Sequence, residues 1–243
     1  AFELIDVEQA GEQVGLGCDR RARQHAAREV AARAGKPPGE PVDEALVVHR
    51  RQAAGGDDLP ADDSVAAGFA RDMQTHHDQA VEMSWIIYDR TDDRFVRSLA
   101  YDIARTQSHQ SGQMAGWLQV WGLPATSSEP TMAWMEGHEH GGSDAMSSGS
   151  MSSGGSSGMP GMASAEELKE LEQATGEEAE VLYLQLMIRH HEGGVPMAQT
   201  AVDAAETEPV RTLAQSIIDS QTVEVETMTE MLEARDGEPL PSP

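Results

Sequence analysis

The sequence predicts an all-α protein, a ferritin-like four-helix bundle built from two copies of one helical hairpin. Apolar residues recur at helical spacing through two long segments. Each segment contains a pair of adjacent histidines framed by methionines, "MQTHHDQAVEM" from Met73 and "MIRHHEGGVPM" from Met187. The segments match at a constant shift of 114 residues without a gap. We therefore expect an internal repeat.

The first half of the chain divides into two parts. Residues 1–60 carry 8 of the 17 basic residues and no wide apolar stripe, so we expect a weakly structured N-terminal extension. Residues 61–124 should form the first hairpin. Its first helix places Phe69, Met73 and His76 on one face, and Gly122 should end its second helix.

The second half begins with residues 125–163, which are rich in Ser, Gly, Met and His and predict a flexible linker. Residues 164–237 should form the second hairpin. Ser164 with Glu167, and Thr175 with Glu178, have capping-box spacing. Pro196 should kink the long helix of this hairpin, because proline lacks an N–H.

Two such hairpins predict a single bundle, because one hairpin alone cannot bury its apolar face. If each hairpin is antiparallel, His76 lies level with Gln107 and His190 with Gln221. These positions offer two interpretations. The histidines are either core residues bonded to the glutamines or part of a metal site.

Composition narrows the classes of partner. The net charge of −25 disfavours nucleic acid and anionic lipid surfaces, and no apolar run is long enough for a membrane span. The single cysteine, Cys18, excludes an intramolecular disulfide and a cysteine metal cluster. Methionine is abundant, with 13 residues against 3 Phe and 3 Tyr. Thioethers favour Cu(I) and imidazoles bind copper, so copper ions are the expected ligand, with Cu(I) favoured.

The candidate metal ligands come from both repeats and from the linker. Met83 lies about 10 Å along the helix from His76, so it is either a core residue or part of a second position. The bundle candidates are Met73, His76, His77, Met83, Met114, Met187, His190, His191, Met197, Glu224 and Met228. Further candidates in the linker are Met132, Met135, His138, His140 and Met146.

The M-x-x-H-H motifs at Met73 and Met187 resemble those of a bacterial domain-of-unknown-function family with a ferritin-like fold. That family includes copper-binding proteins of the CopM type. The resemblance covers residues 64–123 and 175–235. It implies an extracytoplasmic protein that binds Cu(I) or Ag(I) in copper tolerance or trafficking, although no signal peptide is visible. It also implies that the ligands are the two Met-His-His-Met sets. Metal-donor or metal-acceptor proteins would be its partners.

The favoured interpretation is a metal-binding protein without enzyme activity. Two other functions remain open at this point. A metal-free helical interaction module would use the acidic outer faces and Trp117 with Trp121. A di-iron oxidase would need Glu-x-x-His motifs, and neither histidine pair has a glutamate three residues before it.

Overall fold

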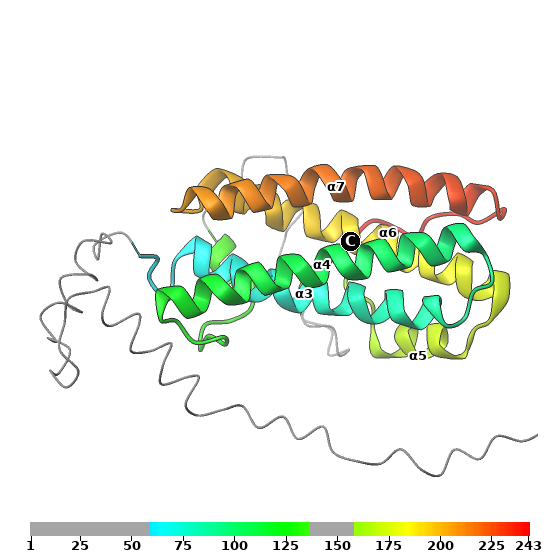
Figure 1. Cartoon of the computed structure of the whole chain (residues 1–243), viewed down its shortest axis with the longest axis horizontal. Coiled ribbons are helices and arrows are strands. Elements are labelled where there is room, and N and C mark those ends of the chain that lie inside the picture. Colours follow the sequence, from blue (N-terminus) through cyan, green and yellow to red (C-terminus); the bar gives the residue numbers. More distant parts are fainter. Residues whose placement is uncertain (1–58, 137–157) are drawn as a thin grey trace, which may run out of the picture. The chain divides into compact units, whose positions relative to one another are not determined.

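The computed structural model describes residues 59–136 and 158–243, which form only helices and connecting segments (Figure 1). The predicted all-α class is confirmed. The expectation for the N-terminal extension falls almost entirely outside these residues and stays a prediction. The helices are α3 (Val65–Tyr88), α4 (Arg94–Trp121), the 3-10 helix η1 (Ala133–Met135), α5 (Ala165–Gln173), α6 (Gly176–Ala204) and α7 (Glu208–Glu233). None of these helices is long and apolar enough to cross a membrane.

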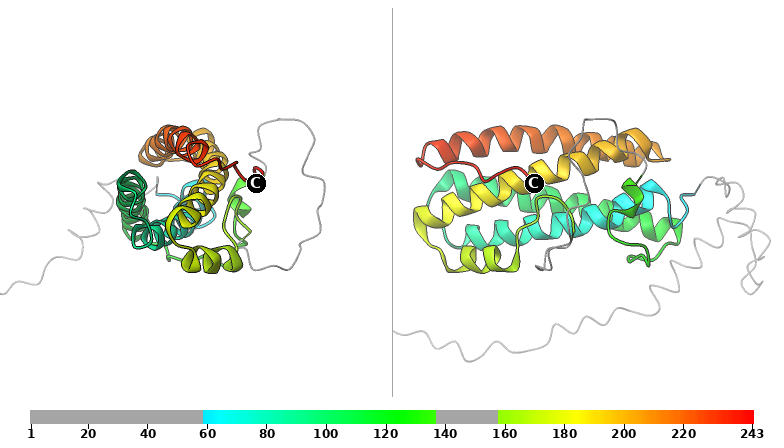
Figure 2. Two further views of the ribbon diagram at one scale, coloured as in Figure 1. Left: turned by 90° about the vertical axis from the view of Figure 1, so that its right-hand side faces the viewer. Right: turned by 180° about the vertical axis from the view of Figure 1, so that it is seen from behind.

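The long helices form two hairpins that meet along α3 and α6. Contacts are most extensive between α3 and α4 and between α6 and α7, and α3 packs on α6 to join the pairs (Figure 2). Asp93 begins α4 by accepting the N–H groups of Phe95 and Val96. Gly122 ends that helix with a left-handed backbone (φ 73°), as its sequence position predicts.

The two predicted capping boxes have different outcomes. Ser164 and Glu167 form the predicted capping box at α5. Thr175 makes no side-chain hydrogen bond at the start of α6, so the second predicted capping box is wrong. Gly176, the next residue, has a positive φ of 59°, which departs from the regular first turn that a capping box needs. The helix continues through Pro196 as one element to Ala204.

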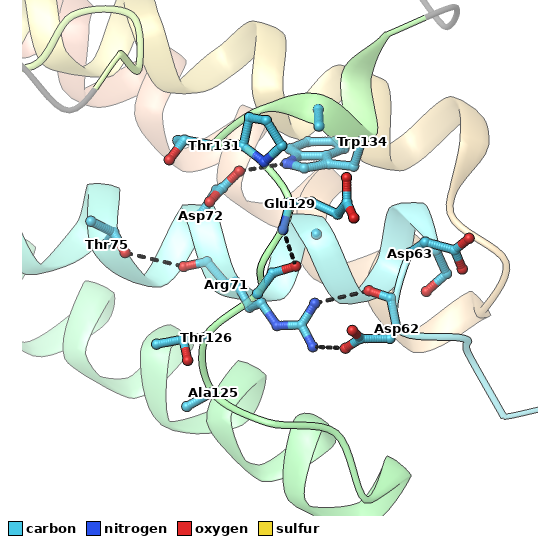
Figure 3. A pocket seen from close by; sticks show the side chains of 15 residues that line it. Asp62, Asp63, Arg71, Asp72, Thr75, Ala125, Thr126, Glu129, Thr131 and Trp134 are labelled. Atoms are coloured by element: carbon cyan, nitrogen blue, oxygen red, sulfur yellow. Dashed lines mark hydrogen bonds and ion pairs between the residues drawn. The ribbon is translucent and has the colours of Figure 1, made fainter.

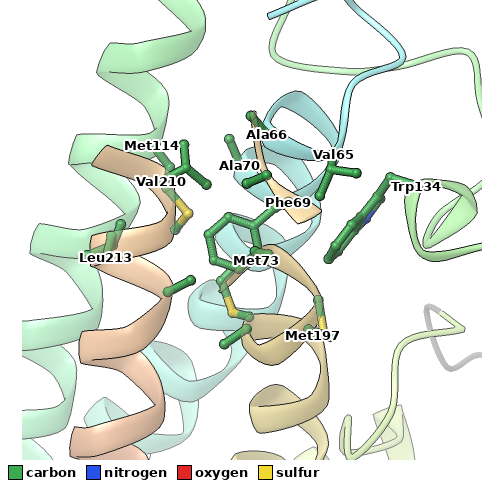
Figure 4. Close-up of a cluster of buried hydrophobic side chains, with 14 of the residues drawn as sticks. Val65, Ala66, Phe69, Ala70, Met73, Met114, Trp134, Met197, Val210 and Leu213 are labelled. Atoms are coloured by element: carbon green, nitrogen blue, oxygen red, sulfur yellow. The ribbon is translucent and has the colours of Figure 1, made fainter. Parts of the chain in front are cut away.

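The buried apolar residues form two clusters, one towards each end of the bundle. The first contains Phe69 and Met73 from α3, together with Met197 from α6 and Val210 from α7 (Figure 4). The second contains Met83 and Ile87 from the later part of α3 and the earlier turns of α6. The histidine pairs lie between these clusters along both helices, because residues 76–77 separate the two groups on α3.

Both ends of the predicted linker are packed against the bundle, which corrects the expectation of a flexible segment over 125–163. Trp134 is 9% exposed and its indole N–H donates to Asp72 on α3 at 2.8 Å. Near the other end, Met159 is 4% exposed and Ala163 is 3% exposed. Composition misled here because a few large side chains anchor a segment that is otherwise Ser- and Gly-rich. Residues 137–157 lie outside the described part of the chain.

The first end of this segment also encloses a cavity of about 420 Å³ beside the start of α3 (Figure 3). The Arg71 side chain is buried at its base. The Arg71 guanidinium donates to the Pro124 carbonyl and to the Asp62 carbonyl and carboxylate. These bonds satisfy the buried cation and tie α3 both to the residues just before it and to the segment that follows α4.

Candidate metal centre

Four histidine side chains are completely buried where α3 and α6 cross. His76, His77, His190 and His191 each have no exposed surface. The rings of His76 and His190, one from each repeat, are in contact, with centroids 3.8 Å apart and planes inclined by 34°. The repeat therefore brings its two equivalent histidines into direct contact at the centre of the bundle.

Hydrogen bonds to carbonyl oxygens define the tautomers of His76 and His190. His76 Nε2 lies 3.2 Å from the Pro160 carbonyl oxygen, and His190 Nε2 lies 3.0 Å from the His76 carbonyl oxygen. A carbonyl oxygen only accepts, so each Nε2 carries the proton and donates it. Each Nδ1 then holds a lone pair, and neither Nδ1 has a hydrogen-bond partner.

These bonds correct one of the two interpretations of the sequence. Glutamine partners were expected if His76 and His190 were ordinary core histidines, but both rings bond to the backbone instead. The Gln107 and Gln221 side chains are nearly fully buried, and none of their amide atoms has a partner. Buried polar groups without partners are rare in native proteins, so this layer requires another explanation.

The second histidine of each pair, His77 in the first repeat and His191 in the second, is called the outer histidine. The hydrogen bonds of these two residues differ between the repeats. His191 Nε2 lies 2.8 Å from the Glu224 carboxylate on α7, which leaves the His191 Nδ1 lone pair without a partner. The equivalent of Glu224 in the first repeat is Gln110. Gln110 is close enough to His77 to favour its protonation slightly, but neither ring nitrogen of His77 meets hydrogen-bond geometry. His77 is therefore the least satisfied of the four rings.

Burial keeps the imidazoles of His76, His77 and His190 neutral. Desolvation by burial lowers the pKa of His76 to about 4. Desolvation also lowers the pKa of His77, to about 3, and electrostatic repulsion from His76 contributes to this shift. Burial also lowers the pKa of His190 well below its ordinary value, and the other imidazoles add to this effect. Neutral rings at pH 7 have the lone pairs that metal binding needs.

The six methionines of the two motifs and their partner helices are also fully buried, but they are grouped across the hairpins. Met73 and Met114 share one apolar cluster with Met197 from the other repeat (Figure 4). By the same exchange, Met83 shares the second cluster with two methionines of the second repeat, Met187 and Met228. Met83 therefore lies with the ligand candidates of the opposite hairpin, and not with His76.

Of the five candidate ligands in the linker, the structure describes only Met132 and Met135. Met132 and Met135 are partly buried against the cluster that contains Met73, and Met132 adopts a left-handed backbone (φ 69°). Both thioethers therefore take part in packing, and their role as metal ligands stays a prediction. His138, His140 and Met146 lie outside the described residues. Trp117 and Trp121, considered for partner binding, stack on each other and also pack partly against this cluster.

The centre contains imidazole lone pairs, with thioethers in the apolar clusters on either side of it, but it is not a preformed metal cage. Within residues 59–136 and 158–243, no group of three or more His, Cys, Asp or Glu side chains is arranged to hold a metal ion. Soft ligands were the sequence expectation, and the methionines that could supply thioethers lie in the apolar clusters on either side of the imidazoles. The residues present fit a soft ion better than a hard one.

Sequence reasoning missed the residues that hold the segment near Pro160 over the histidines. The Gln79 side chain forms two hydrogen bonds with the backbone of Ala163. Its Nε2 donates to the Ala163 carbonyl at 2.9 Å, and its Oε1 accepts the Ala163 N–H at 2.6 Å. Gly193 lets the same segment touch α6, because an added Cβ would lie 2.2 Å from the Pro160 carbonyl oxygen. The repeat offered a signal, since Gln79 and Gly193 occupy equivalent positions and differ.

Comparisons with known proteins identify relatives of this chain. The model of the domain of unknown function DUF305 matches residues 66–232. A DUF305 protein from Streptomyces coelicolor, proposed to be secreted, is 46% identical, with a TM-score of 0.65 over 74% of this chain and 99% of that one. A DUF305 fragment from Deinococcus radiodurans is 33% identical, with a TM-score of 0.54 over 70% of this chain and 96% of that one.

A more distant structure shares the fold. CopM in its Cu(I)-bound form is 21% identical to the chain, with a TM-score of 0.51 over 72% of this chain and 99% of CopM. A search of curated proteins finds no match. The family model spans more than half of the sequence and includes both histidine pairs. The chain therefore belongs to the DUF305 family.

Proposed function

We propose that this protein binds Cu(I), and Ag(I) as its chemical analogue, through imidazole and thioether groups at the centre of the bundle. One observation carries the proposal. Among the described residues, twelve buried side-chain N or O atoms have no hydrogen-bond partner, and nine of them belong to His76, His77, Gln107, His190, His191 and Gln221. A ligand that accepts lone pairs would relieve the cost of burying the imidazole nitrogens and the glutamine oxygens unpaired.

The type of ligand follows from the neighbouring side chains. Neutral imidazole and methionine thioether are soft donors, and a fully buried, mostly neutral site suits a monovalent ion better than a divalent one. The similarity of the fold to CopM, whose structure contains Cu(I), supports the proposal. The role would be handling of copper outside the cytoplasm without catalysis, in keeping with the Streptomyces coelicolor relative.

A Cu(I) titration in the absence of oxygen, in competition with a chromogenic chelator, tests this function. We expect the full chain to withdraw Cu(I) from the chelator. His76→Ala with His190→Ala should abolish that withdrawal and leave the helical circular dichroism largely unchanged. His109→Ala is the matched control, because His109 is exposed on α4.

Three outcomes would count against the central site. Unchanged affinity and stoichiometry in the double variant would show that the imidazoles at the bundle centre are not the ligands. Loss of binding in a His138→Ala, His140→Ala variant with the bundle intact would place the binding in the linker. Absence of Cu(I) binding by the unaltered chain would favour a metal-free interaction module.

A further inference from the structure

Residues 158–163, which we call the strap, cross the buried histidines between the two hairpins. The Pro160 carbonyl accepts from His76 Nε2, Gln79 on α3 binds both backbone groups of Ala163, and Gly193 on α6 gives the strap room. Gly161 is equally constrained: its φ is 78°, and an added Cβ would lie 2.4 Å from the Arg189 carbonyl oxygen. Both hairpins therefore fix the position of the strap.

Because of the strap, the His76 and His190 rings do not have equivalent hydrogen-bond acceptors. Exact equivalence of the repeats would pair His76 Nε2 with the His190 carbonyl, as His190 Nε2 pairs with the His76 carbonyl. The Pro160 carbonyl takes that place instead. The result is a chain of two hydrogen bonds, from His190 to the backbone of His76 and from the His76 ring to the strap. A change at the strap can therefore reach both rings.

We propose that the strap is a positioning element of the metal centre, in which the Pro160 carbonyl holds His76 as its Nε2–H tautomer and presents the Nδ1 lone pair to the ion. Gln79 and Gly193 are positioning residues because they hold the strap in place. This inference rests on the proposed function. Groups that bind the second nitrogen of a ligating histidine orient the ring and fix its tautomer, and their loss typically weakens metal binding 10- to 100-fold.

The other candidate role for the strap is simple packing, since Met159 inserts into the apolar cluster around Met73. The two roles make different predictions. A packing segment changes stability when it is loosened but leaves the tautomer of His76 unchanged. A positioning segment changes the tautomer in the metal-free protein, before any ion is added.

The experiment combines two substitutions with two matched controls in the full chain. Gln79→Ala removes both bonds to Ala163, and Gln74→Ala is its control, because Gln74 on the same helix bonds only to the Ala70 carbonyl. Gly193→Ala places a methyl group against Pro160. Gly116→Ala is its control, because an added Cβ there meets nothing within 4 Å.

The readouts are ring ¹⁵N chemical shifts of labelled histidine in the metal-free protein and Ag(I) affinity by competition. The unaltered chain should show His76 as the Nε2–H tautomer and bind Ag(I). Gln79→Ala and Gly193→Ala should each give mixed tautomers at His76 and about tenfold weaker Ag(I) binding, as for loss of other orienting groups. Both controls should match the unaltered chain.

The outcomes separate this inference from the function on which it rests. If the unaltered chain binds Ag(I) and the two strap variants keep its tautomer and affinity, the positioning role is wrong and the copper site stands. If the unaltered chain does not bind Ag(I), the proposed function fails and the positioning role fails with it. Loss of affinity without a change in tautomer would assign the effect to packing and would also overturn the inference.

Discussion

The two hairpins share a motif, but their histidines have different surroundings. In the second repeat His190 bonds to the backbone of α3 and His191 bonds to Glu224, so both rings have a defined tautomer. In the first repeat His76 depends on the strap, and His77 has no hydrogen-bond partner. The two hairpins have the same motif residues, while differences at a few positions and one crossing segment make their surroundings unequal.

The pH dependence of stability should give the largest effect. His76, His77 and His190 are neutral in the fold, so the unfolded chain binds more protons between pH 6.5 and about 4. Stability is therefore fully present above pH 6.5 and is lost as pH falls, by about 1.4 kcal/mol per pH unit for each histidine. Urea unfolding of the metal-free protein from pH 7 to pH 4.5 measures this slope. A flat profile would contradict the neutral cluster.

The outer histidines should respond with opposite signs to removal of the ring nitrogens. His77→Leu removes two unpaired nitrogens and should stabilise the metal-free protein by about 2 kcal/mol, because buried polar groups without partners are costly. His191→Leu breaks the bond to Glu224 and should destabilise it by about 1 kcal/mol. Thermal unfolding in the presence of a chelator measures both. Equal shifts in the same direction would show that the two positions are equivalent.

Exchanging the residues opposite the outer histidines should exchange the properties of the repeats. Glu224→Gln removes the carboxylate that orients His191 and should weaken metal binding by the second repeat about tenfold. Gln110→Glu should strengthen binding by the first repeat, because it supplies the missing acceptor for His77. Ag(I) titrations of each variant and of the double exchange provide the measurement. Unchanged affinities would show that Glu224 serves stability alone.

The smallest effect concerns the glycine that brings α6 close to His76. An added Cβ at Gly194 would lie 2.9 Å from Gln221 Oε1 and 3.0 Å from His76 Cε1, whereas the first repeat has Ala80 at this position. Gly194→Ala should therefore destabilise the protein by about 1 kcal/mol despite the better helix propensity of alanine. Chemical denaturation beside the Gly116→Ala control measures the difference. A stabilised Gly194→Ala protein would show that the central layer has room to adjust.

Several features follow from the sequence alone. Helical spacing, the caps at Ser164 and Gly122, and the constant shift between Met73 and Met187 are local or repeated patterns, and they predict an all-α fold with two hairpins. The same spacing places His76 and His190 on buried faces. Local chemistry determines these features, because capping and amphipathicity depend on residues within a few turns of one another.

Other features depend on contacts between segments far apart in the chain. The sequence identified Met83 as a core residue or part of a second position, but only the packing of α3 on α6 groups it with Met187. The ends of the 125–163 segment were predicted to be loose, yet Trp134 and Met159 anchor them. Composition reports what a segment can bury on its own and does not show which surface it will meet.

The sequence by itself determined the helices, the repeat and the soft-ligand character of the candidate site. Tertiary structure decided which nitrogen of each buried histidine is free, because a tautomer depends on the acceptor that meets the other nitrogen. For His76 that acceptor is the Pro160 carbonyl, 84 residues away along the chain. A backbone carbonyl has no side-chain identity that a motif could reveal, so only the folded chain shows it.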